Sequence, residues 1–399
     1  MHFVLSFLFF MQNKIRARFK FVEDWQLDAK VTKAIQHLSF FQISTISGCK
    51  FNPRLVAAFC NLYHESDDVF EIGQHKLGIS LEDVFMFTGL PVDGMPLVIA
   101  ESLEPLEVCK HLLGWDRVGI DAVKPGSINL KRLQEKFMVV PTEVEDHSQE
   151  LKYYVRAYLL ALIGSILLPR STEQIVPVSY LLFIDDIDRV DDYAWGAGLL
   201  AQLNSGIRKF RNEPRKCAYG AFWLIQMFIM EHFPSLAKKI MLDHSNTLPT
   251  RLPKRIPLVV EWSKLLKGPS MQSLKNTNFA EMLAAPNLEF ISRPYERIEG
   301  IVRSRLFYSR TLLIGLNYLA YHRPDLFPDQ LGIGEVDMSD LRKIIRFKEK
   351  IRTGDSGKNW PRNYKQYINE WKFRYQSCVK DCSEGTDFVL PQINTTECC

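Results

Sequence analysis

The sequence lacks a hydrophobic run long enough to cross a membrane. Three long stretches without a charged residue hold 11 to 13 residues each: Ala157–Leu168, Ala218–Met230 and Thr311–Tyr321. A transmembrane helix needs about 20. The apolar opening Phe3–Phe10 has no Lys or Arg before it and no small-residue cleavage site after it, which is not typical of a signal peptide. We therefore expect no membrane association, and we interpret the three runs as buried core helices.

Long linkers, internal repeats and a disulfide framework are also missing. No stretch rich in Gly, Ser or Pro divides the 399 residues, and no segment recurs at the period of a solenoid. The eight cysteines are scattered, and a chain of this size does not need disulfides, so we expect reduced thiols in the cytosol or nucleus. A hydrophobic fraction of 46% is typical of a globular protein. One large domain, or two closely packed ones, follows from this length.

Excess basic charge is absent from most of the chain and is concentrated in one segment. Residues 341–380 hold twelve Lys and Arg against three Asp and Glu, whereas the whole chain has a net charge of only +4. Aromatic side chains alternate with the basic ones in this segment. We therefore set residues 336–399 apart as a basic aromatic tail. A chain that ends near Glu335 is expected to stay folded.

Helical periodicity dominates the rest of the chain. Ser80 is a typical N-cap, Asp83 follows it at the third helical position, and Gly89 suits a helix end, which together predict a helix over Leu81–Thr88. Further helices are expected over Trp25–Leu38, Pro53–Tyr63, Leu130–Met138, Gln149–Leu168, Ala194–Lys209, Ala218–His232, Asn278–Leu283 and Arg303–His322. Over Tyr180–Ile184 a short strand and the first turn of a helix fit equally well. The predicted fold class is mainly α, a large multi-helix domain with at most a few short strands.

Four blocks of sequence resemble the plant mobile domain family, also called aminotransferase-like. Ile79–Val84 followed by Thr88–Gly94 is similar to its "T-L-x-D-V…G-L-P-x-D-G" signature, and Arg156–Leu160 to its "R-A-Y-L-L" helix. Tyr193–Ala201 resembles "Y-S-W-G-x-A-x-L-A", and Gly220–Pro234 a helix that ends in "E-H-F-P". The chain departs at Lys76–Gly78, where a "G-E-M" triplet is common, and at Gly198, where alanine is usual. The residues that carry the resemblance are Leu81, Asp83, Val84, Gly89, Leu90, Pro91, Asp93, Gly94, Arg156, Tyr193, Trp195 and Gly196.

The resemblance assigns residues 21–335 to a helical domain of this family, preceded by an N-terminal extension over residues 1–20. Residues 116–150 are polar and irregular and are expected to form a flexible insertion. The family implies a plant nuclear protein, with roles in transposon silencing, genome maintenance or meristem development. It also implies a protein partner in a nuclear complex, including phosphatase-like proteins. A cytoplasmic location is the alternative.

Three patterns in the sequence bring enzyme or cofactor chemistry to mind, and each has a simpler interpretation. A pyridoxal-phosphate enzyme needs a lysine near a Gly/Ser-rich phosphate cup, and none is visible here. Gly196–Ala201 fits G-x-G-x-x-A, but no strand precedes it, so we interpret its small residues as a site where two helices approach closely. Gly354–Gly357 resembles the nucleophile segment of serine proteases, but it lies in the basic tail, and we interpret it as a turn. We therefore expect no catalytic residue, no cofactor and no enzyme activity.

Clustered ionisable side chains suggest metal sites at two places. The acidic cluster consists of Asp185, Asp186, Asp188, Asp191 and Asp192, and it lacks the Gly and Glu of a calcium loop. We interpret it as a solvated turn before the Trp195 helix. The cysteine pair Cys378 and Cys382 has no histidine nearby for zinc. No metal ligand is therefore predicted.

Recognition of a charged partner is the function that these residues indicate. Polar turns at Pro91–Gly94 and Asp185–Asp192 adjoin the family motifs, and loops on a rigid scaffold often bind partners. In the tail, basic charge attracts phosphate and aromatic rings stack on bases; the candidate contacts are Arg342, Lys343, Arg346, Lys350, Trp360 and Trp371. A non-enzymatic nuclear interaction domain is the main hypothesis. The alternatives are a nucleic-acid-binding protein derived from a transposable element and an enzyme with an unrecognised site.

Overall fold

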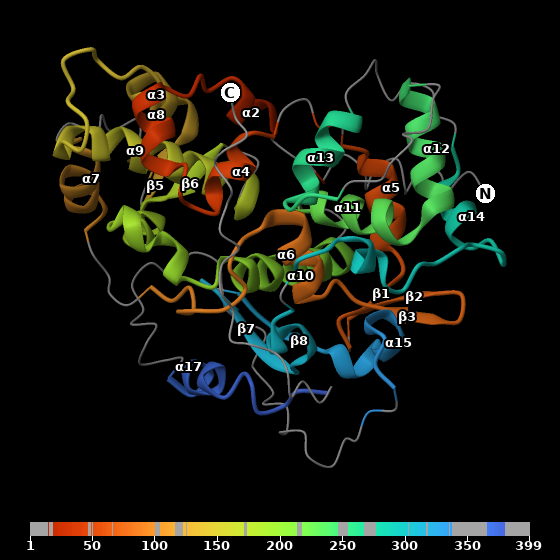
Figure 1. The fold of residues 1–399 in the computed structure, drawn as a ribbon. Helices are drawn as coiled ribbons and strands as arrows, with labels where there is room; N and C mark the ends of the chain where they lie inside the picture. Colours follow the sequence, from red (N-terminus) through yellow and green to blue (C-terminus); the bar gives the residue numbers. More distant parts are fainter. Residues whose placement is uncertain are drawn as a thin grey trace.

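Helices form most of the protein in the computed structural model (Figure 1). The structure describes residue 15 and most of residues 19–379. The gaps between these limits are residues 16–18, 47–48, 50, 66, 100–103, 116–122, 125, 171–173, 214–217, 246–253, 267–276, 302, 317, 335 and 337–364. The mainly α fold class with a few short strands is confirmed.

The α-helices are numbered in the order in which they occur along the chain, as in Figure 1. They are α2 (Phe19–Glu23), α3 (Ala29–Ile35), α4 (Phe40–Ser44), α5 (Pro53–Cys60), α6 (Leu81–Thr88), α7 (Pro105–Leu113), α8 (Leu130–Phe137), α9 (Gln149–Leu162), α10 (Trp195–Asn212), α11 (Trp223–His232), α12 (Pro234–Ser245), α13 (Leu258–Leu265), α14 (Phe279–Leu283), α15 (Pro328–Leu331) and α17 (Lys365–Lys372). A π-helical turn, η1 (Ile163–Leu167), continues α9, and the 3-10 helices are η2 (Val178–Phe183), η3 (Ile187–Asp192), η5 (Pro294–Arg297), η6 (Arg305–Tyr308) and η7 (Pro324–Leu326).

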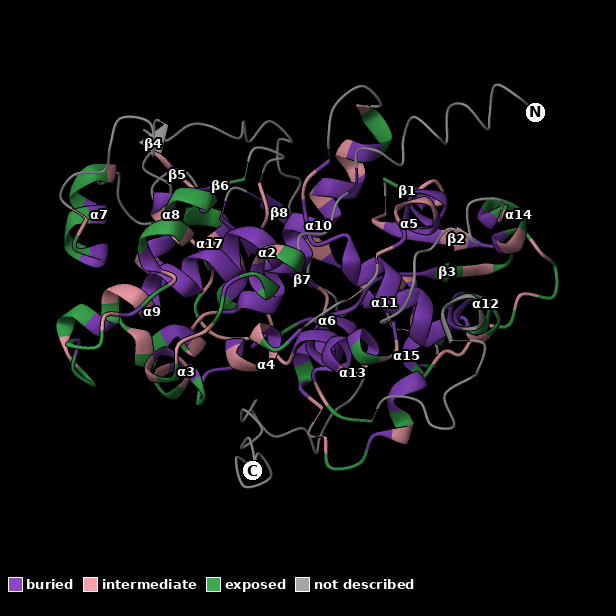
Figure 2. Ribbon diagram, turned by 90° about the horizontal axis from the view of Figure 1, so that it is seen from above, coloured by how far each residue is buried: buried purple, intermediate pink, exposed green. Residues whose placement is uncertain are grey.

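Two groups of helices stand on either side of a central pair in Figure 1. One group contains α3, α7, α8 and α9, and the other contains α5, α11, α12 and α13, with α6 and α10 between them. Every residue of α6 and α11 is buried, and Figure 2 shows the central helices in the colour of burial. A helix that is buried on every side belongs to the core of the protein. The first and third family motifs, at α6 and α10, therefore lie in the centre of the molecule.

The strands are short, and the described ones pair antiparallel. One sheet has the order β1-β2-β3 and joins Tyr63–His64, Val69–Ile72 and His75–Leu77. A second sheet has the order β4-β5-β6 and joins Val123–Lys124, Ser127–Asn129 and Ile175–Pro177. The third is the hairpin of β7 (Thr311–Gly315) and β8 (Tyr318–His322), in which Thr311 pairs with His322 and Gly315 with Tyr318.

The helix predicted over Arg303–His322 is wrong, because this segment forms η6 and the β7–β8 hairpin. A short apolar run does not by its pattern distinguish a buried strand from a buried helix. The contact of Gly315 with α10 gives a physical reason for the strand. It lies against the backbone of Gly198 in α10, where any larger side chain would meet the Gly198 carbonyl. The strand is held so close to the helix that only glycine fits at position 315.

Most other predicted helices are confirmed. Several are shorter than predicted, whereas α10 continues beyond Lys209 to Asn212. The helix over Leu81–Thr88 has the predicted bounds, its Ser80–Asp83 capping box is present, and Gly89 ends it with a left-handed φ of 67°. Leu130–Met138, Gln149–Leu168 and Asn278–Leu283 correspond to α8, to α9 with η1, and to α14. The Trp25–Leu38 helix is reduced to α3. The ambiguous residues Tyr180–Ile184 lie in the 3-10 helix η2 and its C-cap rather than in a strand.

Parts of the three segments set apart in the sequence contact the main body of the protein. Phe19 of α2 packs edge-on against Trp223, with ring centroids 5.8 Å apart. Within residues 116–150, β5 pairs with β6, and Leu133 and Phe137 of α8 are buried. In the tail, Trp371 of α17 is only 2% exposed. A chain that ends near Glu335 would lack α17, and we now expect it to be less stable than the whole chain.

Candidate functional site

Asp83 is the centre of a buried polar network. Its Oδ1 accepts hydrogen bonds from Tyr295 Oη at 2.5 Å and from His232 Nε2 at 3.0 Å. Its Oδ2 accepts from Ser80 N at 2.7 Å, Ser80 Oγ at 2.6 Å and Gln330 Nε2 at 3.4 Å. Burial raises the pKa of the Asp83 carboxyl, but the bonds from His232, Ser80 and Tyr295 outweigh it, so that the pKa is lowered. Asp83 is therefore a carboxylate whose acceptor sites are taken up by the protein itself.

Two buried histidines flank this network. The ring nitrogens of His232 lie 2.7 Å from the Ile291 carbonyl oxygen and 3.0 Å from Asp83 Oδ1. His322 instead accepts from Leu81 N at 3.2 Å through Nε2 and donates to the Ser309 carbonyl through Nδ1. Burial lowers the pKa of His322 to about 4. His232 thus bridges Asp83 and the Ile291 carbonyl, whereas His322 is kept neutral by its burial.

Two further carboxylates at the same place are also paired. Glu231, beside His232 in α11, accepts from Trp262 Nε1 at 2.6 Å and from Arg297 Nη2 at 2.6 Å. Glu82, beside Asp83 in α6, accepts from Arg303 Nε at 2.9 Å. Burial raises the pKa of both carboxyl groups even though each has an arginine partner. Neutral or charged, these groups hold η5 and the following loop against α6 and α11.

The space beside the network is too small for a substrate. The cavity lined by Ser80, Asp83, His232 and Tyr295 has a volume of about 10 Å³, which corresponds to roughly one water molecule. Ser80 donates to Asp83 rather than to a histidine, so the two do not form a nucleophile and base pair. The arrangement stabilises the protein, and both carboxylate oxygens of Asp83 are already hydrogen-bonded within it.

The two central family motifs are joined backbone to backbone. Gly196 N donates to the Pro91 carbonyl at 2.7 Å, Met95 N to the Asp192 carbonyl at 2.8 Å, and Ala194 N to the Met95 carbonyl at 2.8 Å. A Cβ on Gly198 would lie 2.5 Å from Leu97 Cδ1. The glycines of the G-x-G-x-x-A pattern thus allow close packing. Their neighbours are the Pro91–Leu97 segment, β7 and Val84 of α6, so the second helix that we expected is one of several close neighbours.

The turn at Pro91–Gly94 is covered by the tail rather than open to a partner. Trp371 Nε1 donates to the Gly94 carbonyl at 3.0 Å, and Arg374 Nε donates to Asp93 Oδ1 at 2.5 Å. Tyr375 Oη also donates to Asp93. Leu90, Pro91 and Val92 are buried. Of the tail residues proposed as contacts, Trp371 is buried here, and Arg342, Lys343, Arg346, Lys350 and Trp360 lie outside the described residues.

The tryptophans of the third and fourth motifs are scaffold residues, as their apolar surroundings in the sequence predict. Trp195 is 1% exposed, and its Nε1 donates to the Val190 carbonyl at 2.7 Å. Trp223 is 2% exposed, and its Nε1 donates to the Ile166 carbonyl at 3.1 Å. Tyr193 packs edge-on against Phe183 at 5.2 Å. These contacts attach η1, η2 and η3 to the central helices.

The acidic cluster divides into one structural residue and four exposed ones. Asp191 accepts from Ser39 N at 2.8 Å and from Ser39 Oγ at 2.6 Å, which ties η3 to the start of α4. Burial raises the pKa of the Asp191 carboxyl despite these bonds. Asp185, Asp186, Asp188 and Asp192 are exposed. In the described part of the chain, no three His, Cys, Asp or Glu side chains are arranged to hold a metal ion.

A cleft of about 530 Å³ lies between α3, α9 and η3. Arg156, from the second family motif, lies in its wall and is 6% exposed. Its guanidinium donates to the Asp185 carbonyl at 2.6 Å and 3.2 Å, to the Ile184 carbonyl at 3.3 Å and to the Leu112 carbonyl at 3.2 Å. Burial lowers the pKa of Arg156 although the Asp185 carboxylate lies nearby. This arginine fixes the turn that carries the acidic residues.

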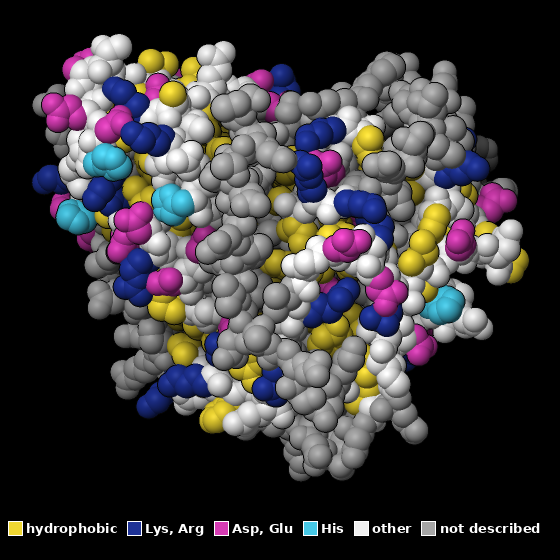
Figure 3. Space-filling view, viewed as in Figure 1, with side chains coloured by type: hydrophobic (Ala, Val, Ile, Leu, Met, Phe, Trp, Pro, Cys, Tyr) yellow, Lys and Arg dark blue, Asp and Glu magenta, His cyan; other side chains and the backbone are white. Residues whose placement is uncertain are grey.

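Side chains of both charge signs gather around this cleft. Figure 3 shows Lys and Arg, Asp and Glu, and histidine side chains close together over the end of the molecule that carries α3 and α9. The charged residues that line the cleft are Lys30, Lys33, Asp146, Lys152, Arg156, Asp185, Asp186 and Asp188, with His37 and His147. The apolar side chains of Ala34, Leu151, Val155 and Ile187 also line it. A volume of this size is within the range of ligand-binding sites.

Sequence reasoning identified Asp83, Arg156 and the acidic turn but missed most of their neighbours. His232, Tyr295 and Gln330 reach Asp83 from positions 149, 212 and 247 residues away. The H-F-P end of the fourth motif was the available signal for His232. Lys30 and Lys152 each lie on a helix whose polar face is unremarkable, so no pattern in the sequence marks them as neighbours of Asp186.

Comparisons with known proteins give the chain its relatives. Protein MAIN-LIKE 2 of Arabidopsis thaliana is 24% identical over 375 residues, which are 91% of this chain and 54% of that protein. Protein MAINTENANCE OF MERISTEMS of the same plant is 26% identical over 334 residues, covering 81% of this chain and 66% of that protein. A serine/threonine-protein phosphatase 7 long form homolog is 23% identical over 91% of this chain and 28% of its own length.

The chain thus spans only part of each of these relatives, about half of the first. No solved structure matches it. None of the helices in the described ranges has the length and hydropathy that a membrane crossing requires. The plant mobile domain family matches residues 39–388, a range that contains all four motifs as well as α17. The chain belongs to the plant mobile domain family.

Proposed function

We propose that this chain is a non-enzymatic interaction domain that binds a protein partner in the plant nucleus. The observation that carries the proposal is the cleft at α3, α9 and η3, whose walls are fixed by Arg156 while its charged side chains stay exposed. The side chains with the most reactive chemistry, Asp83 and His232, are buried and bonded to other protein groups. A rigid scaffold with an exposed charged cleft suits recognition better than turnover.

The names of the relatives support the setting of this proposal. One is named for the maintenance of meristems, and another is named a phosphatase homolog. We infer a role in transposon silencing, genome maintenance or meristem development, with a phosphatase-like protein as one candidate partner. A nuclear location follows from the same inference.

The test is a pull-down from plant nuclei with the full chain as bait. We expect recovery of a defined protein partner at physiological salt, resistant to nuclease, and weaker recovery at high salt. A variant with Asp186 and Asp188 changed to Asn provides the comparison, and its melting temperature is measured first. Recovery of no specific protein, or detection of turnover of a substrate by the purified chain, would contradict the proposal.

A nucleic-acid-binding function is the second candidate, and the charge of residues 341–380 favours it. The counter-observation is that Arg374 and Trp371, at the end of this segment, are engaged within the protein. Binding of duplex DNA is measured against salt concentration, because neutralised phosphates release counterions and give a steep salt dependence. Substitution of Arg342, Lys343 and Arg346 by Gln would lower the affinity and the salt slope if this candidate is right.

A further inference from the structure

The cleft between α3, α9 and η3 has walls that are already in place. On one side, Lys30 of α3 donates to the Thr142 carbonyl at 3.2 Å and to the Val144 carbonyl at 2.6 Å. On the other, Arg156 holds the Asp185 carbonyl, and Asp191 holds Ser39. Since both walls are attached to the body of the protein by these bonds, a ligand does not need to order them. Preorganised sites bind with a smaller loss of conformational entropy.

Some charges of the cleft are balanced inside the protein and others are not. Lys33 pairs with Asp146 at 2.9 Å, and this contact lowers the pKa of the Asp146 carboxyl. His37 Nε2 lies 3.5 Å from Asp188 and balances it only when protonated. In the described part of the chain, Lys152 has no anionic partner. The Asp185 and Asp186 carboxylates lie near the Arg156 guanidinium but accept hydrogen bonds only from backbone N–H groups of their own turn.

The unbalanced charges lie on different walls and have opposite signs. The acidic residues Asp185 and Asp186 lie at the start of η3, whereas Lys152 lies on the solvent-facing side of α9. The lining also contains apolar side chains, of which Leu151 and Val155 are buried and Ile187 is half-buried. A nucleic acid would be repelled by the acidic wall, and a small anion would leave that wall unused. A peptide with side chains of both signs would satisfy both walls and cover the apolar lining.

We propose that this cleft binds an extended segment of a partner protein in which a basic side chain stands close to an acidic one. The basic side chain of the ligand lies against Asp186 and Asp188, and its acidic side chain lies against Lys152. This inference rests on the proposed interaction function and names the surface and the chemistry of the ligand. It therefore needs a test that is independent of the nuclear partner.

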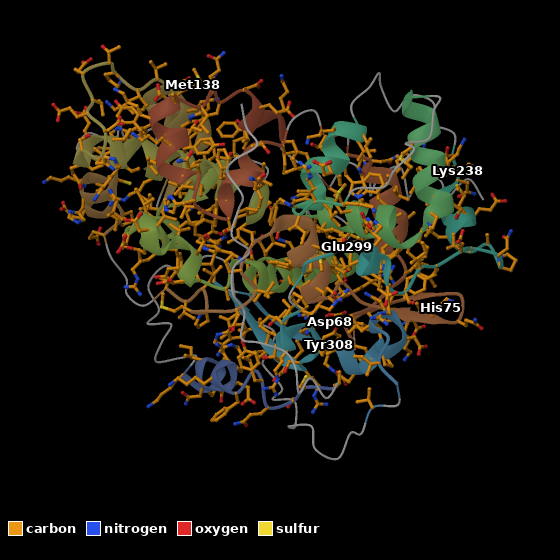
Figure 4. The ribbon with its side chains drawn as sticks, in the orientation of Figure 1. Asp68, His75, Met138, Lys238, Glu299 and Tyr308 are labelled. Atoms are coloured by element: carbon orange, nitrogen blue, oxygen red, sulfur yellow. The ribbon has the colours of Figure 1, made fainter. Side chains whose placement is uncertain are left out.

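Selection from a random twelve-residue peptide library on the purified full chain is that test. Peptides that also bind the triple variant Lys152→Gln, Asp186→Asn, Asp188→Asn are removed. The matched control is Lys238→Gln, Glu289→Gln, Glu299→Gln, which makes the same charge change with exposed residues outside the cleft. Lys238, labelled in Figure 4, belongs to α12 in the opposite group of helices. The affinity of the most enriched peptide is then measured by fluorescence anisotropy for all three proteins.

The expected result is an enriched sequence with a basic and an acidic residue, bound about tenfold more weakly by the cleft variant and unchanged by the control variant. A charge exchange adds a second readout. Lys152→Glu should lose the peptide, and changing the acidic residue of the peptide to Lys should restore binding. No enrichment, peptides of one charge sign, equal binding by the cleft variant, or displacement by duplex DNA would each overturn the inference. Any of these could occur while a nuclear partner binds elsewhere, so failure of the cleft is distinguishable from failure of the proposed function.

Discussion

Two regions of this protein are rich in ionisable side chains, and they use them in opposite ways. Around Asp83 the charged groups are buried and each has partners inside the protein. Around Asp186 most of them are exposed, and several have no hydrogen-bonded partner of opposite sign in the described residues. The residue types are similar, so the sequence alone does not separate the two regions. Burial makes one of them part of the fold and leaves the other available to a ligand.

The energetic consequence of this difference is large. Removing one member of a buried ion pair leaves the other charge without solvent or partner, which costs far more than removing an exposed charge. Stability measurements should therefore separate the two regions clearly. The predictions below run from the largest expected effect to the smallest.

The largest effect is expected for Asp83→Ala. The substitution leaves the His232 ring and the Tyr295 hydroxyl without their partner and removes the side chain that closes the capping box of α6. We expect a loss of about 3–5 kcal/mol in the free energy of unfolding, measured by urea denaturation. Asp83→Asn keeps the size of the side chain but not its charge, so its loss in the free energy of unfolding should be smaller than that of Asp83→Ala. A loss below about 1 kcal/mol would mean that the network does not hold the core together.

The pH dependence of stability should reveal the neutral histidine of the same region. The folded protein keeps His322 neutral to a pKa of about 4, whereas the unfolded chain binds a proton near the ordinary value of 6.5. Protons therefore favour the unfolded chain between these values, and stability present above pH 6.5 is lost as the pH falls towards 4. The difference corresponds to roughly 3 kcal/mol.

The measurement is the free energy of unfolding at pH 7, 6, 5 and 4 for the wild type and for His322→Gln. Glutamine can accept from Leu81 N and donate to the Ser309 carbonyl without titrating, so the variant should show a flatter profile over this range. Further loss below the usual pKa of an aspartate should persist in the variant, because the pKa of Asp83 is lowered in the folded protein. Parallel profiles for the two proteins would rule out the assignment for His322.

An intermediate effect is expected where the tail meets the body of the protein. Trp371 covers the Gly94 carbonyl, and Arg374 pairs with Asp93 beside it. We expect Trp371→Ala to cost about 2 kcal/mol through lost burial, and a chain that ends near residue 335 to be less stable still. Phe373→Ala is the control, because this aromatic residue of the same segment is 40% exposed. If the truncated chain has the wild-type melting temperature, the domain ends near Glu335, as the sequence predicted, and the tail is not part of its core.

What the sequence predicted well is local, and what it missed depends on contacts between distant residues. The capping box at Ser80 and the end of α6 at Gly89 follow from residues a few positions apart. The β7–β8 hairpin does not, because Gly198, more than a hundred residues earlier, sets the space that Gly315 must fit. Trp371 was grouped with basic neighbours as a nucleic-acid contact, but its surroundings are set by the Pro91–Gly94 turn.

The site shows the same limit within a single turn. Asp186, Asp188 and Asp191 look alike in the sequence, and all three were interpreted as solvated. Only the structure brings Ser39 to Asp191 across a separation of 152 residues. The spacing of acidic residues says where a charged turn lies, whereas the position of α4 decides which of its carboxylates is structural.

The smallest effect on stability is therefore expected for Asp186→Asn with Asp188→Asn, and it is the sharpest test of the comparison. Both side chains are exposed, and Asn retains an oxygen that can accept at the start of η3, where Asp186 accepts from Asp188 N. The melting temperature should not change measurably. Asp191→Ala, three residues further on, should lower it, because Ser39 N and Oγ would lose their acceptor inside the protein.

Binding should show the reverse order: the double variant loses the cleft ligand while Asp191→Ala, examined below its own melting temperature, retains it. If Asp191→Ala is as stable as the double variant, η3 is not tied to α4 as the hydrogen bonds indicate, and Asp191 belongs with the exposed carboxylates of the turn in this comparison.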